Sequence, residues 1–127
     1  MATVELTAEN SGPVTGGDGL ALVGFWASWC GPCRVFGPVF ERASGWHADV
    51  VFGKVDTGAQ QELAGAFGIS WIPTLMLIRD GVILCAQPGA LPEPTLEQLI
   101  ARARELDMDE VRAGIAERSE PAPARGA

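Results

Sequence analysis

The hydrophobic positions of the chain fall into two kinds of pattern, short continuous runs and runs with helical spacing. The continuous runs have strand length and predict strands at residues 3–6, 20–27, 50–55, 74–78 and 82–86. The longest run, LALVGFWA at 20–27, has the near-continuous apolar character of a strand that is buried on both faces. Asp80 and Gly81 separate the last two runs and predict a hairpin turn between them.

Three segments show the apolar spacing of a helix: one after Cys33, one at 58–67 and one at 96–106. Pro38 lies within the first segment, where a proline is expected to kink the helix. Gly68 stands where it would end the second helix. The positions that carry the spacing are Phe36, Val39, Phe40 and Ala43, then Leu63 and Phe67, then Leu96, Leu99, Ile100, Ala103 and Leu106.

The last helical segment carries two capping signals. Thr95 with Gln98 predicts one capping box, and Asp107 with Glu110 predicts a second. The second box indicates that the helix breaks and restarts as an extension at 107–118. Its apolar stripe is expected to pack against the body rather than to bind a partner; the stripe consists of Met108, Val111 and Ile115.

The order of these elements predicts an α/β fold of one domain at residues 1–106. Parallel strands joined by helices, followed by a hairpin and a covering helix, imply a sandwich with a mixed sheet. Residues 8–19 are rich in Gly, Ser, Asn and Pro, so we expect a loop with at most one weak helical turn. The tail at 119–127 has the composition of a disordered segment.

The net charge and the number of cysteines argue against several classes of protein. The net charge is −7, so a strongly basic surface for nucleic acid or anionic membrane is not expected. No basic residue precedes the apolar run at 20–27, which is also too short to span a bilayer, so we expect no membrane anchor and a cytoplasmic location. The 3 cysteines are an odd number, which argues against a disulfide-stapled scaffold.

Cys30 and Cys33 enclose Gly-Pro directly after the buried strand, in the sequence WCGPC. A structural zinc site needs four ligands, and besides this pair the chain offers only Cys85 and His47. A structural disulfide between the pair would close a very short loop and would stabilise the fold little. We therefore expect no metal and favour redox chemistry.

A dithiol at the start of a helix has the properties that redox chemistry needs. The exposed N–H groups and the dipole of the helix favour a thiolate on Cys30, which is the attacking species. Cys33 lies on the same helical face and can resolve the mixed disulfide that Cys30 forms. Pro32 suits the first helical turn, and Gly31 lets a partner chain approach closely.

The segment FWASWCGPC resembles the active-site segment of thioredoxins, and the resemblance extends from about Thr3 to Ala103. It implies the thioredoxin fold, a three-layer α/β/α sandwich around a mixed sheet. It also implies a protein-disulfide reductase with a reversible Cys30–Cys33 disulfide and no bound cofactor. Electrons would come from NADPH through thioredoxin reductase, and the other partners would be protein disulfides. We expect a monomer.

The resemblance assigns further roles by position. Trp29 matches a tryptophan that shields the site, and Pro38 matches the proline of the active-site helix. Pro73 matches a proline with a cis peptide bond that faces the cysteines, and Lys54 matches a lysine beneath the site. The expected docking surface for substrates is largely uncharged and consists of Trp29, Gly31, Pro32, Trp71, Ile72, Pro73 and Gly89. Trp71 stands where the family usually has a smaller residue, with partial core packing as the alternative to a role in partner choice.

Gly24 departs from the family pattern, in which this strand position carries a buried aspartate that accepts the proton of the resolving thiol. A glycine cannot titrate, so resolution by Cys33 should be slow unless water relays the proton or Lys54 lowers the pKa of Cys33. The alternative functions are therefore a specialised thioredoxin-like protein with weak reductase activity, a disulfide isomerase or oxidase, and a redox-linked holdase.

Cys85 and His47 remain outside this site. Cys85 lies on the apolar strand at 82–86, where we expect a small core residue rather than a regulatory thiol. His47 follows the active-site helix and is expected at the surface without a catalytic role.

Overall fold

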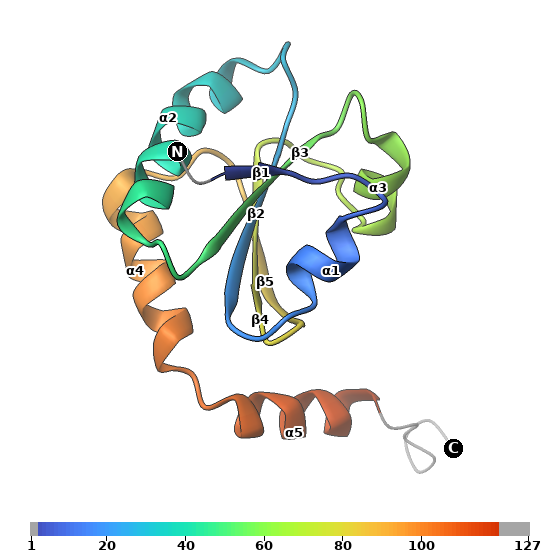
Figure 1. The fold of residues 1–127 in the computed structure, drawn as a ribbon, viewed down its shortest axis with the longest axis vertical. Coiled ribbons are helices and arrows are strands. Elements are labelled where there is room, and N and C mark those ends of the chain that lie inside the picture. The colour runs from blue at the N-terminus through green and yellow to red at the C-terminus, as the bar shows by residue number, and fades with distance from the viewer. Residues whose placement is uncertain (1–2, 120–127) are drawn as a thin grey trace.

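The computed structural model describes residues 3–119 and shows a five-stranded mixed sheet with the order β1-β3-β2-β4-β5 (Figure 1). The strands are β1 (Thr3–Glu5), β2 (Leu20–Trp26), β3 (Val51–Asp56), β4 (Thr74–Arg79) and β5 (Val82–Pro88). Strands β1, β3 and β2 run parallel, whereas β4 is antiparallel to β2 and β5 is antiparallel to β4. The five predicted strands are confirmed with boundary shifts of one or two residues.

Helices cover both faces of the sheet, which makes the three layers of the predicted sandwich (Figure 1). The helices are α1 (Ser11–Thr15), α2 (Gly31–Trp46), α3 (Gln61–Ala66), α4 (Glu93–Glu105) and α5 (Met108–Ser119). Helices α2 and α4 pack on one face, and α1 and α3 lie over the other. Strand β2 is central and is buried between the two layers, as its continuous apolar run predicted.

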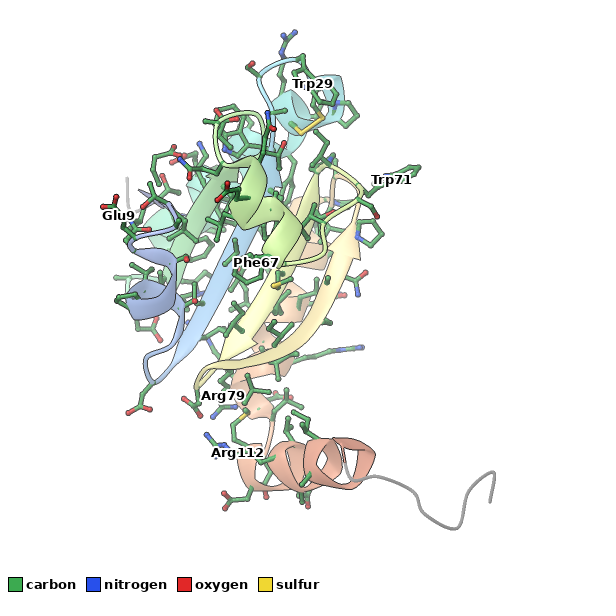
Figure 2. All side chains as sticks on the ribbon, turned by 90° about the vertical axis from the view of Figure 1, so that its right-hand side faces the viewer. Glu9, Trp29, Phe67, Trp71, Arg79 and Arg112 are labelled. Atoms are coloured by element: carbon green, nitrogen blue, oxygen red, sulfur yellow. A yellow bond between two sulfur atoms is a disulfide. The ribbon has the colours of Figure 1, made fainter. Side chains whose placement is uncertain are left out.

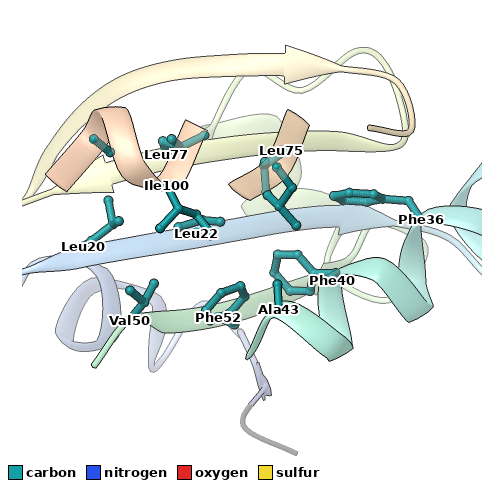
Figure 3. Packing of buried hydrophobic residues seen from close by; sticks show 12 residues of the cluster. Leu20, Leu22, Phe36, Phe40, Ala43, Val50, Phe52, Leu75, Leu77 and Ile100 are labelled. Carbon is teal, nitrogen blue, oxygen red and sulfur yellow. The ribbon is translucent and has the colours of Figure 1, made fainter. Parts of the chain in front are cut away.

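The core is divided by the sheet into two apolar clusters. The larger cluster fills the space between the sheet and helices α2 and α4 (Figure 3). Its members include Leu22, Phe36, Phe40, Phe52, Leu75, Leu77 and Ile100. Phe40 packs edge-on against Phe52 with 5.2 Å between ring centroids, so this α2 residue is tied to the neighbouring strand β3.

Two predicted chain reversals are confirmed by their backbone angles. Asp80 (φ 52°) and Gly81 (φ 78°) both adopt the left-handed conformation that a tight hairpin turn needs, and they join β4 to β5. Gly68 (φ 70°) lies just beyond α3 in the same conformation.

Two helix starts can be compared with the predictions. Residues 11–15 form the short helix α1 within the segment expected to be a loop with at most one weak helical turn, and Ser11 and Val14 contribute buried or half-buried side chains there. The capping box predicted at Thr95 is wrong, because α4 already begins at Glu93 after the cap residue Pro92. A proline in the first turn suits a helix start because it has no N–H to leave unpaired.

The C-terminal extension forms helix α5, which begins at the predicted restart. The Asp107 carboxylate accepts hydrogen bonds from the N–H groups of Asp109 and Glu110 at 3.0 and 3.4 Å. Met108 is buried, and Arg112 lies 3.7 Å from the Asp80 carboxylate at the hairpin turn. The extension therefore contacts the body at the β4–β5 turn, while residues 120–127 of the predicted tail lie outside the described residues.

Candidate active site

The two cysteines of the WCGPC segment lie where β2 ends and α2 begins. Cys30 is the N-cap residue of α2, and its Sγ accepts a hydrogen bond from the N–H of Cys33 at 3.2 Å. The two residues form a disulfide with 5.3 Å between their Cα atoms. Pro32 occupies the first turn of α2, as predicted. The helix start thus supplies a donor to the Cys30 sulfur, which favours a thiolate there after reduction.

Both cysteines are shielded from solvent. They are 5% and 7% exposed, and they pack with the buried Ala27 and the partly buried Trp26 and Ile72. An apolar setting limits side reactions of the sulfurs and leaves a reaction partner to approach along one surface.

The loop before β4 is brought next to the dithiol. Its Ile72–Pro73 peptide bond is cis, as the resemblance implied, and Pro73 lines the same pocket as Cys33. The Pro73 carbonyl accepts a hydrogen bond from the N–H of Gly89 at 2.7 Å. Gly89 (φ 94°) is in a backbone conformation that favours glycine, so it joins the end of β5 to this loop.

Two exposed tryptophans flank the dithiol. Trp29 is 73% exposed and Trp71 is 67% exposed. Figure 2 shows Trp29 beside the disulfide and Trp71 projecting away from the body on the same end of the molecule. The alternative of core packing for Trp71 is therefore wrong. The Trp71 carbonyl accepts a hydrogen bond from the Thr74 hydroxyl, which holds the backbone of this loop while leaving the indole free to contact a partner.

Gly24 lies in β2 between Lys54 of β3 and Leu75 of β4. A Cβ at this position would stand 3.6 Å from the ring of Phe40, which is ordinary van der Waals contact. The position opens into a pocket of about 330 Å³ behind the dithiol, which Cys33, Phe40 and Lys54 also line. The glycine is therefore not required by crowding at Cβ, and a side chain at this position would face the pocket.

Lys54 forms an ion pair and a cation–π contact. Its Nζ donates to Glu41 Oε1 at 3.2 Å and lies 5.2 Å from the centre of the Trp26 ring. Glu41 also accepts from the Thr3 hydroxyl at 3.0 Å. The carboxylate offsets the charge that Lys54 presents to the site. Sequence reasoning missed Glu41, because a helix residue and a strand residue 13 positions apart give no local signal.

Cys85 and His47 stand apart from the dithiol. Cys85 is half-buried on β5 against the larger apolar cluster, and burial raises the pKa of its thiol. His47 lies at the edge of the core, where its side chain is 18% exposed. Its ring is half-buried and holds a hydrogen bond of 2.8 Å between Nε2 and Glu97 Oε1. Among residues 3–119 no group of three or more potential metal ligands occurs.

Comparison with known proteins decides the family. A family profile for thioredoxin matches residues 3–102, which contain the whole sheet and the dithiol. The chain belongs to the thioredoxin family. It is 59% identical over 116 residues to "Putative thioredoxin 2" of Streptomyces coelicolor, covering 91% of this chain and 87% of the relative. It is 36% identical over 101 residues to the thioredoxin of Bacillus subtilis, covering 79% and 96% respectively.

A solved thioredoxin has the same fold. The crystal structure of the thioredoxin from Malassezia sympodialis superimposes with a TM-score of 0.72 and 33% identity, covering 80% of this chain and 93% of that one. Together with the Cys30–Cys33 pair at disulfide distance, family membership establishes a thiol–disulfide oxidoreductase. Within the described part of the chain, every helix is too short or too polar to cross a membrane.

Proposed function

We propose that this thioredoxin reduces protein disulfides, with Cys30 as the nucleophile and Cys33 as the resolving thiol. The observation that carries the proposal is the position of Cys30 at the N-cap of α2, where the N–H of Cys33 donates to its sulfur. A thiolate is stabilised there, and the thiolate is the form that attacks a disulfide.

The reaction has two exchange steps. The Cys30 thiolate attacks one sulfur of the client disulfide, so that a mixed disulfide forms and the other client sulfur leaves as a thiolate. Cys33 then loses its proton and attacks the Cys30 sulfur, which releases the second client thiolate. The products are a client dithiol and the Cys30–Cys33 disulfide seen in the structure.

The client is held by the surface around the dithiol. Trp29 and Trp71 supply exposed apolar area, and the backbone of Ile72 before the cis Pro73 suits pairing with an extended segment. Gly31 and Pro32 are exposed and uncharged beside the sulfurs, and Gly89 completes the rim. This surface favours unfolded or extended protein segments over small charged substrates.

The oxidised protein then needs an electron donor. We assign this role to a thioredoxin reductase that draws on NADPH, with the protein acting as a cytoplasmic monomer that binds no cofactor. Family membership supports this route, since the 59% identical relative is named a thioredoxin.

The test is a coupled assay that follows NADPH consumption with thioredoxin reductase and a protein disulfide. Turnover is expected for the parent and for Cys85→Ser, whose cysteine lies on β5 away from the dithiol. Cys30→Ser should be inactive, and Cys33→Ser should accumulate a client adduct visible by mass spectrometry. Turnover by Cys30→Ser would refute the assignment of the nucleophile.

The coupled assay, a redox titration and an aggregation assay together distinguish the reductase from an oxidase or isomerase and from a holdase. No turnover by the parent, while a known thioredoxin works in parallel, would overturn the general reductase. A redox titration that gives a strongly oxidising dithiol would then favour an oxidase or isomerase. Suppression of client aggregation without turnover would favour a holdase.

A further inference from the structure

A pocket lies behind the dithiol, and the two exchange steps described above assign no role to it. It measures about 330 Å³ and lies between the start of α2 and strand β2. Its lining residues are Gly24, Phe25, Trp26, Ala27, Ser28, Cys33, Arg34, Phe36, Gly37, Pro38, Phe40, Lys54 and Pro73. The volume is at the lower end of the range for small-molecule sites, so a ligand of few non-hydrogen atoms fits.

The lining of the pocket is mostly apolar, and its charged side chains have the same sign. Apolar groups dominate, with the rings of Phe36 and Phe40 and the prolines Pro38 and Pro73. The charged residues among the described lining are Lys54 and Arg34, and both are cationic. Glu41 lies outside the lining and offsets the charge of Lys54, so Arg34 gives this region its excess of positive charge.

Lys54 keeps donor capacity for a ligand. An ammonium group has three N–H donors, and Lys54 gives one to Glu41 at 3.2 Å. Gly24 is the register neighbour of Lys54 on the adjacent strand and adds no side chain in front of it. An anionic head group can therefore reach the ammonium from the pocket, while an apolar body packs on the Phe40 ring.

We propose that this pocket binds a small monocarboxylate with a short aliphatic or aromatic body. The carboxylate lies at Lys54 and the body contacts Phe36 and Phe40, so charge and shape are both complementary. The proposal deepens the reductase function and rests on it for its consequence, because Cys33 lines the same pocket.

The consequence concerns the proton of Cys33. During resolution the bound carboxylate accepts the Cys33 proton while the Cys33 sulfur attacks the Cys30 sulfur of the mixed disulfide. The Cys30–client bond breaks, the client sulfur leaves with the electron pair as a thiolate, and the carboxylic acid gives its proton to water. The ligand is thus an exchangeable base, and no electron passes through it.

Binding is tested on the oxidised protein, which needs no turnover. Acetate, propionate, butyrate and benzoate are titrated at constant ionic strength, and the amide signals of Gly24 and Lys54 are followed by NMR. We expect saturable shifts that tighten from acetate to butyrate, with none from chloride or from butyramide. Shifts equal to those from chloride, or the absence of saturation, would overturn the proposal.

Two variants with side chains of matched size test whether the pocket affects the rate of resolution by Cys33. Gly24→Asn and Gly24→Asp introduce side chains of similar size, and a Cβ at this position would be in ordinary van der Waals contact with Phe40 at 3.6 Å. Circular dichroism of both variants checks that they are folded. Both should abolish carboxylate binding. In single-turnover reactions near neutral pH, butyrate should accelerate resolution in the parent alone, whereas Gly24→Asp should be fast without it, by about 10²-fold over Gly24→Asn.

The outcomes of these experiments distinguish the proposed carboxylate pocket from the proposed reductase function. Saturable binding without disulfide turnover would leave the pocket assignment standing and remove the reductase function. Turnover without binding, or equal acceleration by butyrate in the parent and Gly24→Asn, would remove the pocket assignment and leave the reductase function standing.

Discussion

The positive charge of Lys54 behind the dithiol is partly offset by a neighbouring carboxylate. The ammonium lies over the Trp26 ring and donates to Glu41, whose carboxylate offsets its charge. Its attraction for a thiolate on Cys33 is therefore weaker than that of an isolated lysine. We therefore expect assistance to proton transfer to come from the pocket that Gly24 opens rather than from this charge alone.

Trp71 should contribute to client binding rather than to the exchange steps. It is 67% exposed and flanks the dithiol, so Trp71→Ala removes apolar contact area without touching the sulfurs. We expect KM for a protein disulfide to rise about fivefold to thirtyfold, as for interface residues worth 1–2 kcal/mol, with kcat nearly unchanged. Steady-state kinetics with the reductase in excess measures the two parameters.

Trp46 provides the matched control for this substitution. It is 61% exposed and lies at the far end of α2 from the cysteines. Trp46→Ala should leave both kinetic parameters unchanged. An equal rise in KM for the two variants would contradict a local role for Trp71.

Helices α2 and α4 are joined by a polar network at the end of α2. Arg104 of α4 donates to Nδ1 of His47 at 3.1 Å, and Nε2 of His47 contacts Glu97 at 2.8 Å. The His47 ring therefore links Arg104 to Glu97, two residues of α4. These two contacts fix the orientation of the ring at the end of α2.

Asp49 extends this network and should make stability depend on acid pH. Its hydrogen bonds to Arg104, at 2.5 and 3.0 Å, lower its pKa from 3.8 to about 2. A group with a depressed folded-state pKa stabilises the fold above its unfolded pKa and loses that contribution as pH falls through the folded value. Asp49→Asn should therefore be less stable than the parent above pH 4, with a difference that shrinks as pH falls towards about 2.

Urea unfolding of both proteins between pH 2 and 6 measures this difference. Asp18→Asn serves as the control, because Asp18 lies exposed in the loop before β2. A difference between Asp49→Asn and the parent that stays constant down to the lowest pH would contradict the ion pair as its cause.

The dithiol and the C-terminal extension lie at opposite ends of the molecule. The dithiol lies at the end of β2 that leads into α2, whereas α5 contacts the β4–β5 turn at the opposite end of the sheet (Figure 1). Arg79 near this turn donates to the carbonyls of Ala103 and Leu106 at 2.8 and 2.7 Å, which anchors the end of α4. The extension thus contacts the end of the fold opposite the dithiol.

Deletion of residues 107–127 should lower stability and leave disulfide reduction unchanged. The loss of the buried Met108 side chain costs about 2 kcal/mol. Urea unfolding measures the stability, and the coupled assay measures kcat/KM. Met108→Ala should reproduce most of the stability loss, and a fall in kcat/KM for the deletion would show that α5 reaches the site.

The sequence predicted the features that depend on local pattern. Continuous apolar runs gave the strands, helical spacing gave α2, α3 and α4, and WCGPC indicated the dithiol at a helix start. The starts of α1 and α4 were missed or misplaced, because α1 is a short helix without a side-chain cap and α4 starts after Pro92. Neither has the side-chain cap by which a helix start is recognised in a sequence.

The sequence by itself determined the dithiol, the elements that carry it and the absence of a titratable side chain at Gly24, since each is a property of residue type and spacing. Only the tertiary structure decided what surrounds them. The Glu41 partner of Lys54, the His47 network and the pocket behind Cys33 join segments that are distant in the chain. Such contacts depend on how helices pack across a sheet, and the order of residues along one element does not encode that packing.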